Sequence, residues 1–201
     1  MPKPKQPPRA WQRMLSGRRL DLLDPSPFDV EIEDIAHGLA RVARWNGQTV
    51  GNHPFSVAQH SLIVEAVMRQ KFPDMPADAA LMALLHDGPE YVIGDMISPF
   101  KSAIGEGYKA IEAKLEAAIH LRFGLPAHPN RELKRQIKSA DHVSAYFEAV
   151  HLAGFDKAEA EILFGSPNGI DPSDLPITPW STQKAQTAFV ERFHQLHDQL
   201  K

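Results

Sequence analysis

The chain has 201 residues, of which 43% are hydrophobic and 23% are charged, as in a globular protein with one full core. It contains no cysteine, which excludes disulfides, zinc–thiolate sites and a cysteine nucleophile. The net charge of −3 argues against a nucleic-acid-binding surface, and no stretch approaches the roughly 20 apolar residues that span a bilayer. Because the N-terminal region also lacks an apolar signal segment, we expect a cytoplasmic protein without nucleic-acid or membrane partners.

The first part of the chain differs in charge from the rest. Residues 1–19 include six basic residues and no acidic one, and residues 1–10 are rich in proline. This composition predicts a disordered basic tail over residues 1–10, followed by one folded domain over residues 11–201. The alternative is that the tail is an arm that binds an anionic partner. A short extended pair is expected near residues 18–23.

Apolar side chains recur at three- and four-residue spacing along most of the chain, which predicts amphipathic helices. The expected helices cover residues 32–43, 57–68, 79–87, 108–122, 133–147 and 185–200. Ser56 is the expected N-cap of the second helix. Segments rich in glycine, proline and asparagine predict loops at residues 44–54, 72–76, 94–107 and 165–179. The fold class predicted from this pattern is all-α, a single-domain helical bundle.

A His86-Asp87 doublet follows seven consecutive apolar residues, 79–85. A helix that is apolar on all sides is buried, so the doublet is expected at the edge of a core. Burying a carboxylate there is costly unless a positive group pairs with it. Pro89 is expected to end or kink the helix, and on a continuing helix Glu90 would face the same side as the doublet.

Two further helices each carry a polar residue on an apolar face. His60 stands among valines, and Asp141 follows Ile137 by one turn. Taken alone, each has a simpler explanation, namely a hydrogen-bonded core histidine or a local carboxylate contact. Taken together with the doublet, one divalent ion would satisfy all of them. Two imidazoles and two carboxylates favour Mn, Fe, Co, Ni or Zn over Mg or Ca.

With these four residues in this order, the chain resembles the HD-domain metal-dependent phosphohydrolases. Local segments resemble the branch that contains bacterial 5′-deoxynucleotidases, namely SVAQHS (56–61), LLHDGPEYVIGD (84–95), SPFK (98–101), YKAIE (108–112) and IKSADHVSAYFEA (137–149). Two more segments resemble compact proteobacterial and phage members, namely SGRRLDLLDP (16–25) and DIAHGLARVARWNG (34–47). The resemblance implies an HD-type helical domain with His60, His86, Asp87 and Asp141 as metal ligands.

The resemblance also implies roles for five other residues. Glu90 and Asp95 match acids that handle the attacking water beside the metal. Arg44 matches an arginine that engages the substrate phosphate, and Trp45 matches a tryptophan that disfavours a ribose 2′-hydroxyl. Lys101 is a second candidate phosphate contact. Related proteins are often dimers, so a homodimer is also expected.

The function implied by the resemblance is hydrolysis of nucleoside or deoxynucleoside 5′-monophosphates by metal-activated water. A first alternative is an HD phosphohydrolase of another phosphoester, such as a nucleoside triphosphate, a cyclic nucleotide or an alarmone. A second is a metal-stabilised module that binds nucleotide without hydrolysing it. The sequence contains no glycine-rich phosphate loop, so side chains and metal would have to hold the phosphate.

Overall fold

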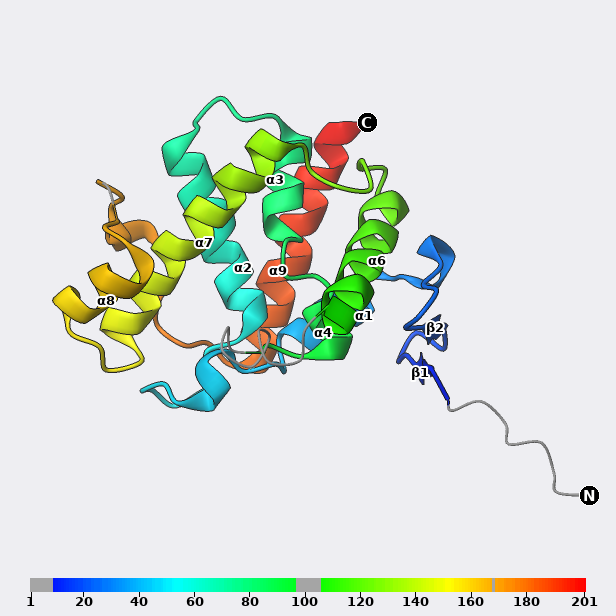
Figure 1. Cartoon of the computed structure of the whole chain (residues 1–201), viewed down its shortest axis with the longest axis horizontal. Helices are drawn as coiled ribbons and strands as arrows, with labels where there is room; N and C mark the ends of the chain where they lie inside the picture. Colours follow the sequence, from blue (N-terminus) through cyan, green and yellow to red (C-terminus); the bar gives the residue numbers. More distant parts are fainter. Residues whose placement is uncertain (1–8, 97–105, 168) are drawn as a thin grey trace, which may run out of the picture.

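The computed structural model describes residues 9–96, 106–167 and 169–201, which form a helical bundle with one small hairpin (Figure 1). The α-helices described are α1 (Ile32–Leu39), α2 (Val57–Lys71), α3 (Ala77–Leu84), α4 (Glu90–Ile93), α6 (Glu106–Arg122), α7 (Arg131–His151), α8 (Lys157–Phe164) and α9 (Thr182–His197). Short 3-10 helices occupy η1 (Pro27–Asp29), η2 (Arg44–Gly47), η3 (Pro172–Asp174) and η4 (Asp198–Leu200). The predicted all-α fold class is confirmed.

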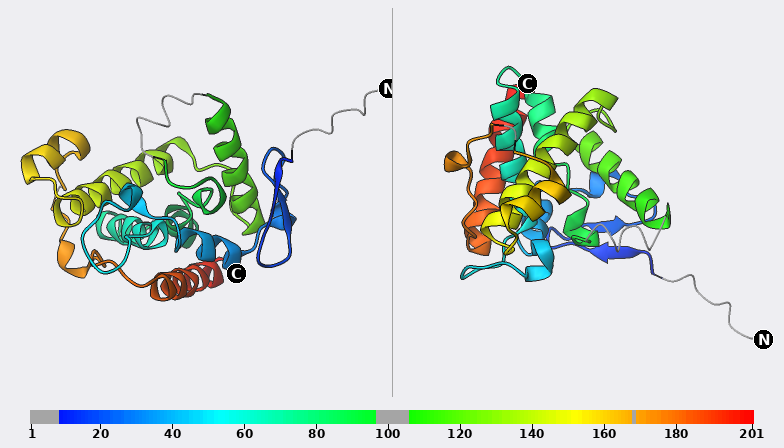
Figure 2. Two further views of the ribbon diagram at one scale, coloured as in Figure 1. Left: turned by 90° about the horizontal axis from the view of Figure 1, so that it is seen from below. Right: turned by 60° about the vertical axis from the view of Figure 1, so that its left-hand side comes forward.

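Helix α2 lies at the centre of the bundle, between α7 and α9 and against α3 (Figures 1 and 2). Its apolar stripe is buried as predicted, with Val57, Val64 and Met68 fully enclosed. Ser56 caps the helix, because its hydroxyl accepts a hydrogen bond from the backbone N–H of Gln59 at 3.2 Å. His60, on the same helix, is likewise fully buried.

Helix α1 is shorter than the predicted helix over residues 32–43, because it ends at Leu39. The residues that follow pair with the segment before α2 instead of continuing the helix. Val57 N–H donates to the Val42 carbonyl at 3.0 Å, and Arg44 N–H donates to the Phe55 carbonyl at 2.8 Å. This extended pairing satisfies backbone groups near the start of α2 and brings Arg44 alongside it.

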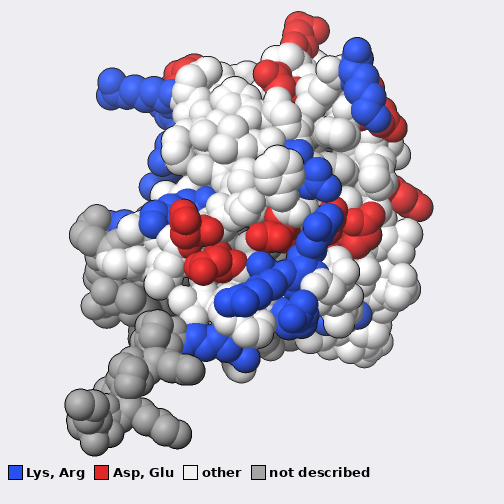
Figure 3. Space-filling model, turned by 90° about the vertical axis from the view of Figure 1, so that its right-hand side faces the viewer, with Lys and Arg blue, Asp and Glu red and all other residues white. Residues whose placement is uncertain are grey.

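The expected extended pair is a hairpin in which β1 (Trp11–Arg13) and β2 (Arg19–Asp21) run antiparallel. The expectation over residues 18–23 covered only its second strand. Fully buried Leu20 anchors the hairpin, and the Ser16 hydroxyl donates to Asp34 at 2.5 Å. On the face over α6 and the hairpin, basic and acidic side chains are interspersed (Figure 3). The predicted tail, residues 1–10, lies mostly outside the described residues.

Helix α8 was not predicted from the sequence, although Asp156 and Glu159 form a capping box at its start. Its exposed side carries Ile162 and Leu163, which blurs the amphipathic pattern on which the prediction relied. In the predicted loop over residues 165–179, the described residues contain no helix or strand other than the single turn η3. Among the helices of the described residues, none is long and apolar enough to cross a membrane.

Candidate metal centre

The His86-Asp87 doublet lies in a turn, whereas the sequence predicted it at the end of the helix over residues 79–87. Helix α3 ends at Leu84, five residues before Pro89, and Pro89 instead starts α4 as its N-cap. Gly88 N–H donates to the Leu85 carbonyl at 2.8 Å, and Glu90 N–H donates to the Asp87 carbonyl at 3.0 Å. The helix ends before the doublet, ahead of the expected break at Pro89, so the condition of a continuing helix under which Glu90 would face the same side is not met.

Close packing fixes this turn and the helix that follows it. A side chain at Gly88 would meet the Leu85 carbonyl at 2.8 Å and Ile119 of α6 at 3.1 Å. A side chain at Gly38 of α1 would meet the Tyr91 carbonyl of α4 at 2.7 Å. Because neither site has room for a β-carbon, the two glycines let α4 pack directly against its neighbours. This packing holds Glu90 at 2% exposure.

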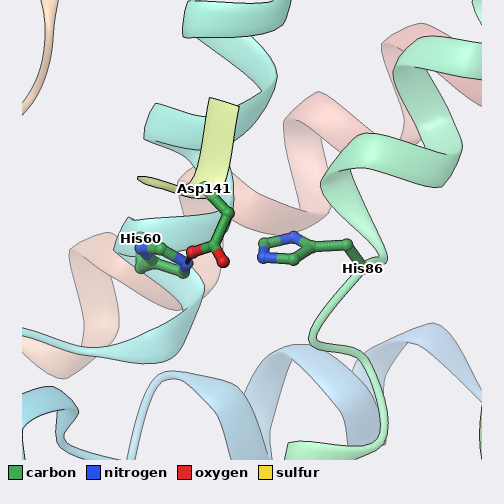
Figure 4. Close-up of side chains that lie close together, drawn as sticks. All are labelled: His60, His86 and Asp141. Atoms are coloured by element: carbon green, nitrogen blue, oxygen red, sulfur yellow. Dashed lines mark ion pairs between the residues drawn. The ribbon is translucent and has the colours of Figure 1, made fainter. Parts of the chain in front are cut away.

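His60, His86 and Asp141 point toward one another from three separate elements (Figure 4). His60 comes from α2, Asp141 from α7, and His86 from the turn after α3. Each residue contributes one ligand atom, and these atoms lie within 4.8 Å of one another. His60 Nε2 is 3.3 Å from Asp141 Oδ1 and 3.4 Å from Asp87 Oδ2. The structure thus brings together all four residues that the sequence predicted as ligands.

Both imidazoles make a hydrogen bond through Nδ1, on the side of the ring away from this centre. His60 Nδ1 lies 2.5 Å from Glu148 Oε1, and His86 Nδ1 lies 2.9 Å from the Ala83 carbonyl. Because both partners are acceptors, each Nδ1–H is the donor in these contacts, and Nε2 is the ring nitrogen that faces the carboxylates. The two Nε2 atoms are buried, and neither has a hydrogen-bond partner among the described residues. Two orphaned imidazole nitrogens beside two carboxylates fit a divalent transition metal.

The electrostatics around these residues favour the charged carboxylates. Burial raises the pKa of Asp87, but the neighbouring His86 and His60 outweigh it and hold the pKa well below the ordinary value. Burial likewise raises the pKa of Asp141, and His60 brings it below the ordinary value. Both carboxyl groups are therefore ionised near neutral pH and able to neutralise a cation.

Sequence reasoning missed Glu148, a fully buried acid of α7. Its Oε1 accepts hydrogen bonds from His60 Nδ1–H and from the Ser144 hydroxyl at 2.9 Å. Its Oε2 accepts from Trp45 Nε1–H at 2.8 Å and from Arg44 Nε–H at 3.3 Å. Burial raises the pKa of Glu148, but Arg44 and His60 more than offset this, so the carboxyl group stays ionised. The signal available in the sequence was its spacing of seven residues from Asp141, which is two helical turns on the same face.

The predicted substrate-binding residues lie on the other side of Glu148, in the short segment η2. Arg44 Nη1 lies 3.6 Å from Asp95 Oδ2, so this arginine joins two acids. Burial lowers the pKa of Arg44, and Glu148 and Asp95 raise it by more, which keeps the guanidinium charged. The Trp45 ring packs against Phe155 at 5.7 Å and Phe164 at 5.8 Å between centroids. Lys101, the remaining predicted contact, lies outside the described residues.

Comparison with known proteins assigns this arrangement to a family. The sequence model of the family described as 5′-deoxynucleotidase YfbR-like matches residues 35–161, which is more than half of the chain. The chain belongs to the YfbR-like 5′-deoxynucleotidase family. The matched region contains all four predicted ligands together with Arg44, Trp45, Glu90 and Asp95. As a YfbR-like protein, the chain is a metal-dependent phosphohydrolase of the HD-domain superfamily, with a phosphorylated small molecule as substrate.

Two relatives are similar to this YfbR-like chain over most of their length. The uncharacterized protein RCAP_rcc00048 of Rhodobacter capsulatus is 56% identical over 188 residues, which cover 94% of this chain and 96% of the relative. The uncharacterized protein YfdR of Escherichia coli is 30% identical over 170 residues, covering 85% of this chain and 86% of the relative. Both similarities extend well beyond the metal centre, so they include the bundle that positions it.

Proposed function

We propose that this YfbR-like protein hydrolyses the 5′-phosphomonoester of nucleoside monophosphates, with a preference for deoxyribose. The observation that carries the proposal is that one buried acid, Glu148, contacts both the predicted metal ligands and the predicted substrate-binding residues. On one side of Glu148, His60 belongs to the cluster of imidazoles and carboxylates. On the other side, the same carboxylate binds Arg44 and Trp45. A cation site next to a guanidinium and an indole suits a substrate that combines phosphate, sugar and base.

His60, His86, Asp87 and Asp141 are the residues that would hold the divalent ion. When bound, such an ion supplies Lewis-acid chemistry toward a phosphate oxygen and a water molecule. The two Nε2 atoms and the ionised carboxylates are the donors that this chain contributes. Because each Nδ1 bonds an acceptor on the far side of its ring, Nε2 would be the nitrogen of each histidine that binds the ion.

Arg44 is proposed to bind the non-bridging phosphate oxygens. Its Nε is directed to Glu148 and its Nη1 to Asp95, and a guanidinium has five N–H donors in all. The remaining donors would bind the phosphate, and the two acids keep the group charged and oriented. Trp45 is proposed to lie against the sugar and to disfavour a 2′-hydroxyl. Lys101 stays a candidate for a second phosphate contact.

Glu90 and Asp95 are proposed to move the protons. One of them takes a proton from the attacking water as its oxygen forms a bond to phosphorus. The other donates a proton to the O5′ atom as the P–O5′ bond breaks, which releases the nucleoside and inorganic phosphate. The burial of Glu90 and the contact of Asp95 with Arg44 support a location beside the reacting phosphate.

The experiment that tests this proposal is elemental analysis of the purified protein combined with a panel of phosphoesters. The panel contains dAMP, AMP, other 5′-monophosphates, a nucleoside triphosphate, a cyclic nucleotide and an alarmone. We expect a bound transition metal and the fastest turnover with a deoxynucleoside monophosphate. Faster turnover of another phosphoester would show that this other compound class is the substrate. Bound metal without any turnover would indicate a nucleotide-binding module.

The expected homodimer and the domain limits stay predictions, which gel filtration and limited proteolysis would test.

A further inference from the structure

Glu148 occupies a position that the ligand set and the substrate contacts leave unexplained. It has no exposed surface, and its two carboxylate oxygens bind groups from two other elements, α2 and η2, and from its own helix α7. We propose that Glu148 is a positioning residue whose single carboxylate fixes both the metal ligand His60 and the substrate-facing turn of Arg44 and Trp45. This inference rests on the proposed function for its consequence on substrate choice, but not for its structural part.

The Oε1 atom of Glu148 determines the state of His60. A carboxylate only accepts hydrogen bonds, so Nδ1–H of His60 is the donor in the contact at 2.5 Å, and Nε2 is directed toward Asp87 and Asp141. The Ser144 hydroxyl, one turn earlier on α7, donates to the same oxygen at 2.9 Å. Partners of this kind orient metal-binding imidazoles and raise their basicity, and their loss lowers metal affinity by about 10- to 100-fold.

The Oε2 atom of Glu148 holds a strained turn. Trp45 and Asn46 adopt φ values of 57° and 50°, a left-handed conformation that side-chain-bearing residues rarely occupy. Such a conformation persists only where surrounding contacts impose it. Here the indole N–H and the guanidinium Nε–H of two consecutive residues both donate to Oε2. The carboxylate therefore sets the direction in which the Trp45 ring and the Arg44 side chain project.

The number of hydrogen-bond donors that contact residue 148 explains why this residue is a glutamate. Four N–H and O–H groups point at this side chain, and one of them belongs to a charged guanidinium. An ionised carboxylate has two acceptor oxygens and can satisfy all four, whereas an amide has one acceptor oxygen and one donor group. Glu148→Gln keeps the volume but removes the charge that strengthens both sets of bonds, whichever way the amide turns.

The test compares Glu148→Gln with the wild-type protein and with Glu132→Gln. Glu132 lies on the same helix, but it is exposed and pairs with Arg135 on the surface. The first readout is the dissociation constant for Zn²⁺ added to chelator-treated protein, measured by calorimetry. The second is hydrogen exchange of the Trp45 indole N–H by NMR, with the resonance assigned from Trp45→Phe. The third is the ratio of kcat/KM for dAMP to that for AMP.

For Glu148→Gln we expect Zn²⁺ affinity to fall by about 10- to 100-fold. Indole exchange should become at least about tenfold faster, because the hydrogen bond that protects the proton is weakened. The dAMP-to-AMP ratio should fall about tenfold as the Trp45 ring loses its fixed position. Glu132→Gln should match the wild type in all three measurements.

Wild-type Zn²⁺ affinity or wild-type indole exchange in folded Glu148→Gln would overturn the proposal, because each tests one half of the coupling. If that variant does not fold, Glu148→Asp is measured with the same criteria, since it keeps the charge but is too short to reach both sets of donors. The first two readouts need no substrate. A protein that hydrolyses no nucleotide therefore refutes the proposed function while these readouts still decide the role of Glu148.

Discussion

Helix α2 carries two buried ionisable residues whose surroundings differ. Glu65 faces α9, and Arg192 donates to both of its oxygens, at 2.8 and 3.0 Å. Arg69 of the same helix adds a further contact to Glu65. His60, five residues earlier, faces α7 and has its Nδ1 bonded to Glu148, but its Nε2 has no hydrogen-bond partner in the part of the chain that the structure describes. We call Glu65 the closed site, because arginines of the protein bind both of its oxygens. We call His60 and the residues around it the open site, because Nε2 faces a cluster of carboxylates that could hold an ion.

The comparison separates a structural polar group from a functional one. Buried polar atoms in native proteins are almost always hydrogen-bonded, and so an exception requires an explanation. Gln59, next to His60, follows the rule, because its side chain bonds the backbone of Pro176, Thr178 and Trp180 and holds that loop against α2. Other buried atoms of the described residues, such as His120 Nε2, also lack a hydrogen-bond partner. The Nε2 atoms of His60 and His86 differ from His120 Nε2 because they lie close together beside two carboxylates, as ligands of a shared ion would.

The largest expected effect comes from removing a ligand at the open site. Asp87→Ala takes away the carboxylate that lies within 3.4 Å of both imidazole nitrogens. We expect turnover of dAMP to fall below detection and bound metal to be lost, because two imidazoles and one carboxylate remain. Elemental analysis and a phosphate-release assay measure both. Chelator treatment of the wild type should reproduce the loss of activity, and added metal should restore it only in the wild type. Full activity of metal-stripped Asp87→Ala would refute the assignment of the site.

A smaller effect is expected from the turn that holds the doublet. In Gly88→Ala the new β-carbon would meet the Leu85 carbonyl at 2.8 Å, and a backbone atom cannot move away cheaply. We expect a loss of about 1–3 kcal/mol in unfolding free energy, together with a lower kcat from a displaced His86-Asp87 pair. Urea unfolding and steady-state kinetics measure the two. Gly107→Ala, where a β-carbon meets open space, serves as the control. A Gly88→Ala protein equal to the wild type would show that the turn tolerates displacement.

At the closed site the effect should fall on stability alone. Glu65→Ala leaves two arginines without their acceptor, and it should lower the free energy of unfolding by about 1–3 kcal/mol. Metal content and kcat should stay within about twofold of wild type, since Glu65 bonds only Arg69 and Arg192 among the described residues. Thermal unfolding and dAMP turnover provide the comparison. A large loss of turnover in the folded variant would mean that the two halves of α2 are not independent.

The smallest expected effect is a pH dependence at the same residue. Burial raises the pKa of Glu65 above its ordinary value, and Arg192 offsets this only in part. The folded protein therefore keeps the Glu65 proton to a higher pH than the unfolded chain does, so stability falls as pH rises through the interval between the two pKa values. Relative to Glu65→Gln, the wild type should gain stability as pH is lowered from neutral toward 4.5. Urea unfolding at several pH values measures this, and parallel curves for the two proteins would contradict it.

Much of the molecule was predictable because its signals are local. Helical spacing identified α2, α6, α7 and α9, and the unbroken apolar run identified α3 as a buried helix. Local prediction failed where long-range contacts compete with it. The segment after Leu39 is not helical, because its backbone pairs with residues 55–57. The His86-Asp87 doublet lies in a turn between α3 and α4. Helix α8 escaped because its apolar residues do not all face the core.

The sequence by itself determined the all-α class and the four metal-ligand candidates, since residue type and order along the chain are sufficient for both. Only the tertiary structure decided that these side chains converge, that both imidazoles present Nε2, and that Glu148 joins them to Arg44 and Trp45. The physical reason is distance along the chain. Glu148 meets partners 88 to 104 residues away. Its spacing from Asp141 places both acids on one face of α7, but no local pattern encodes which distant side chains that face will meet.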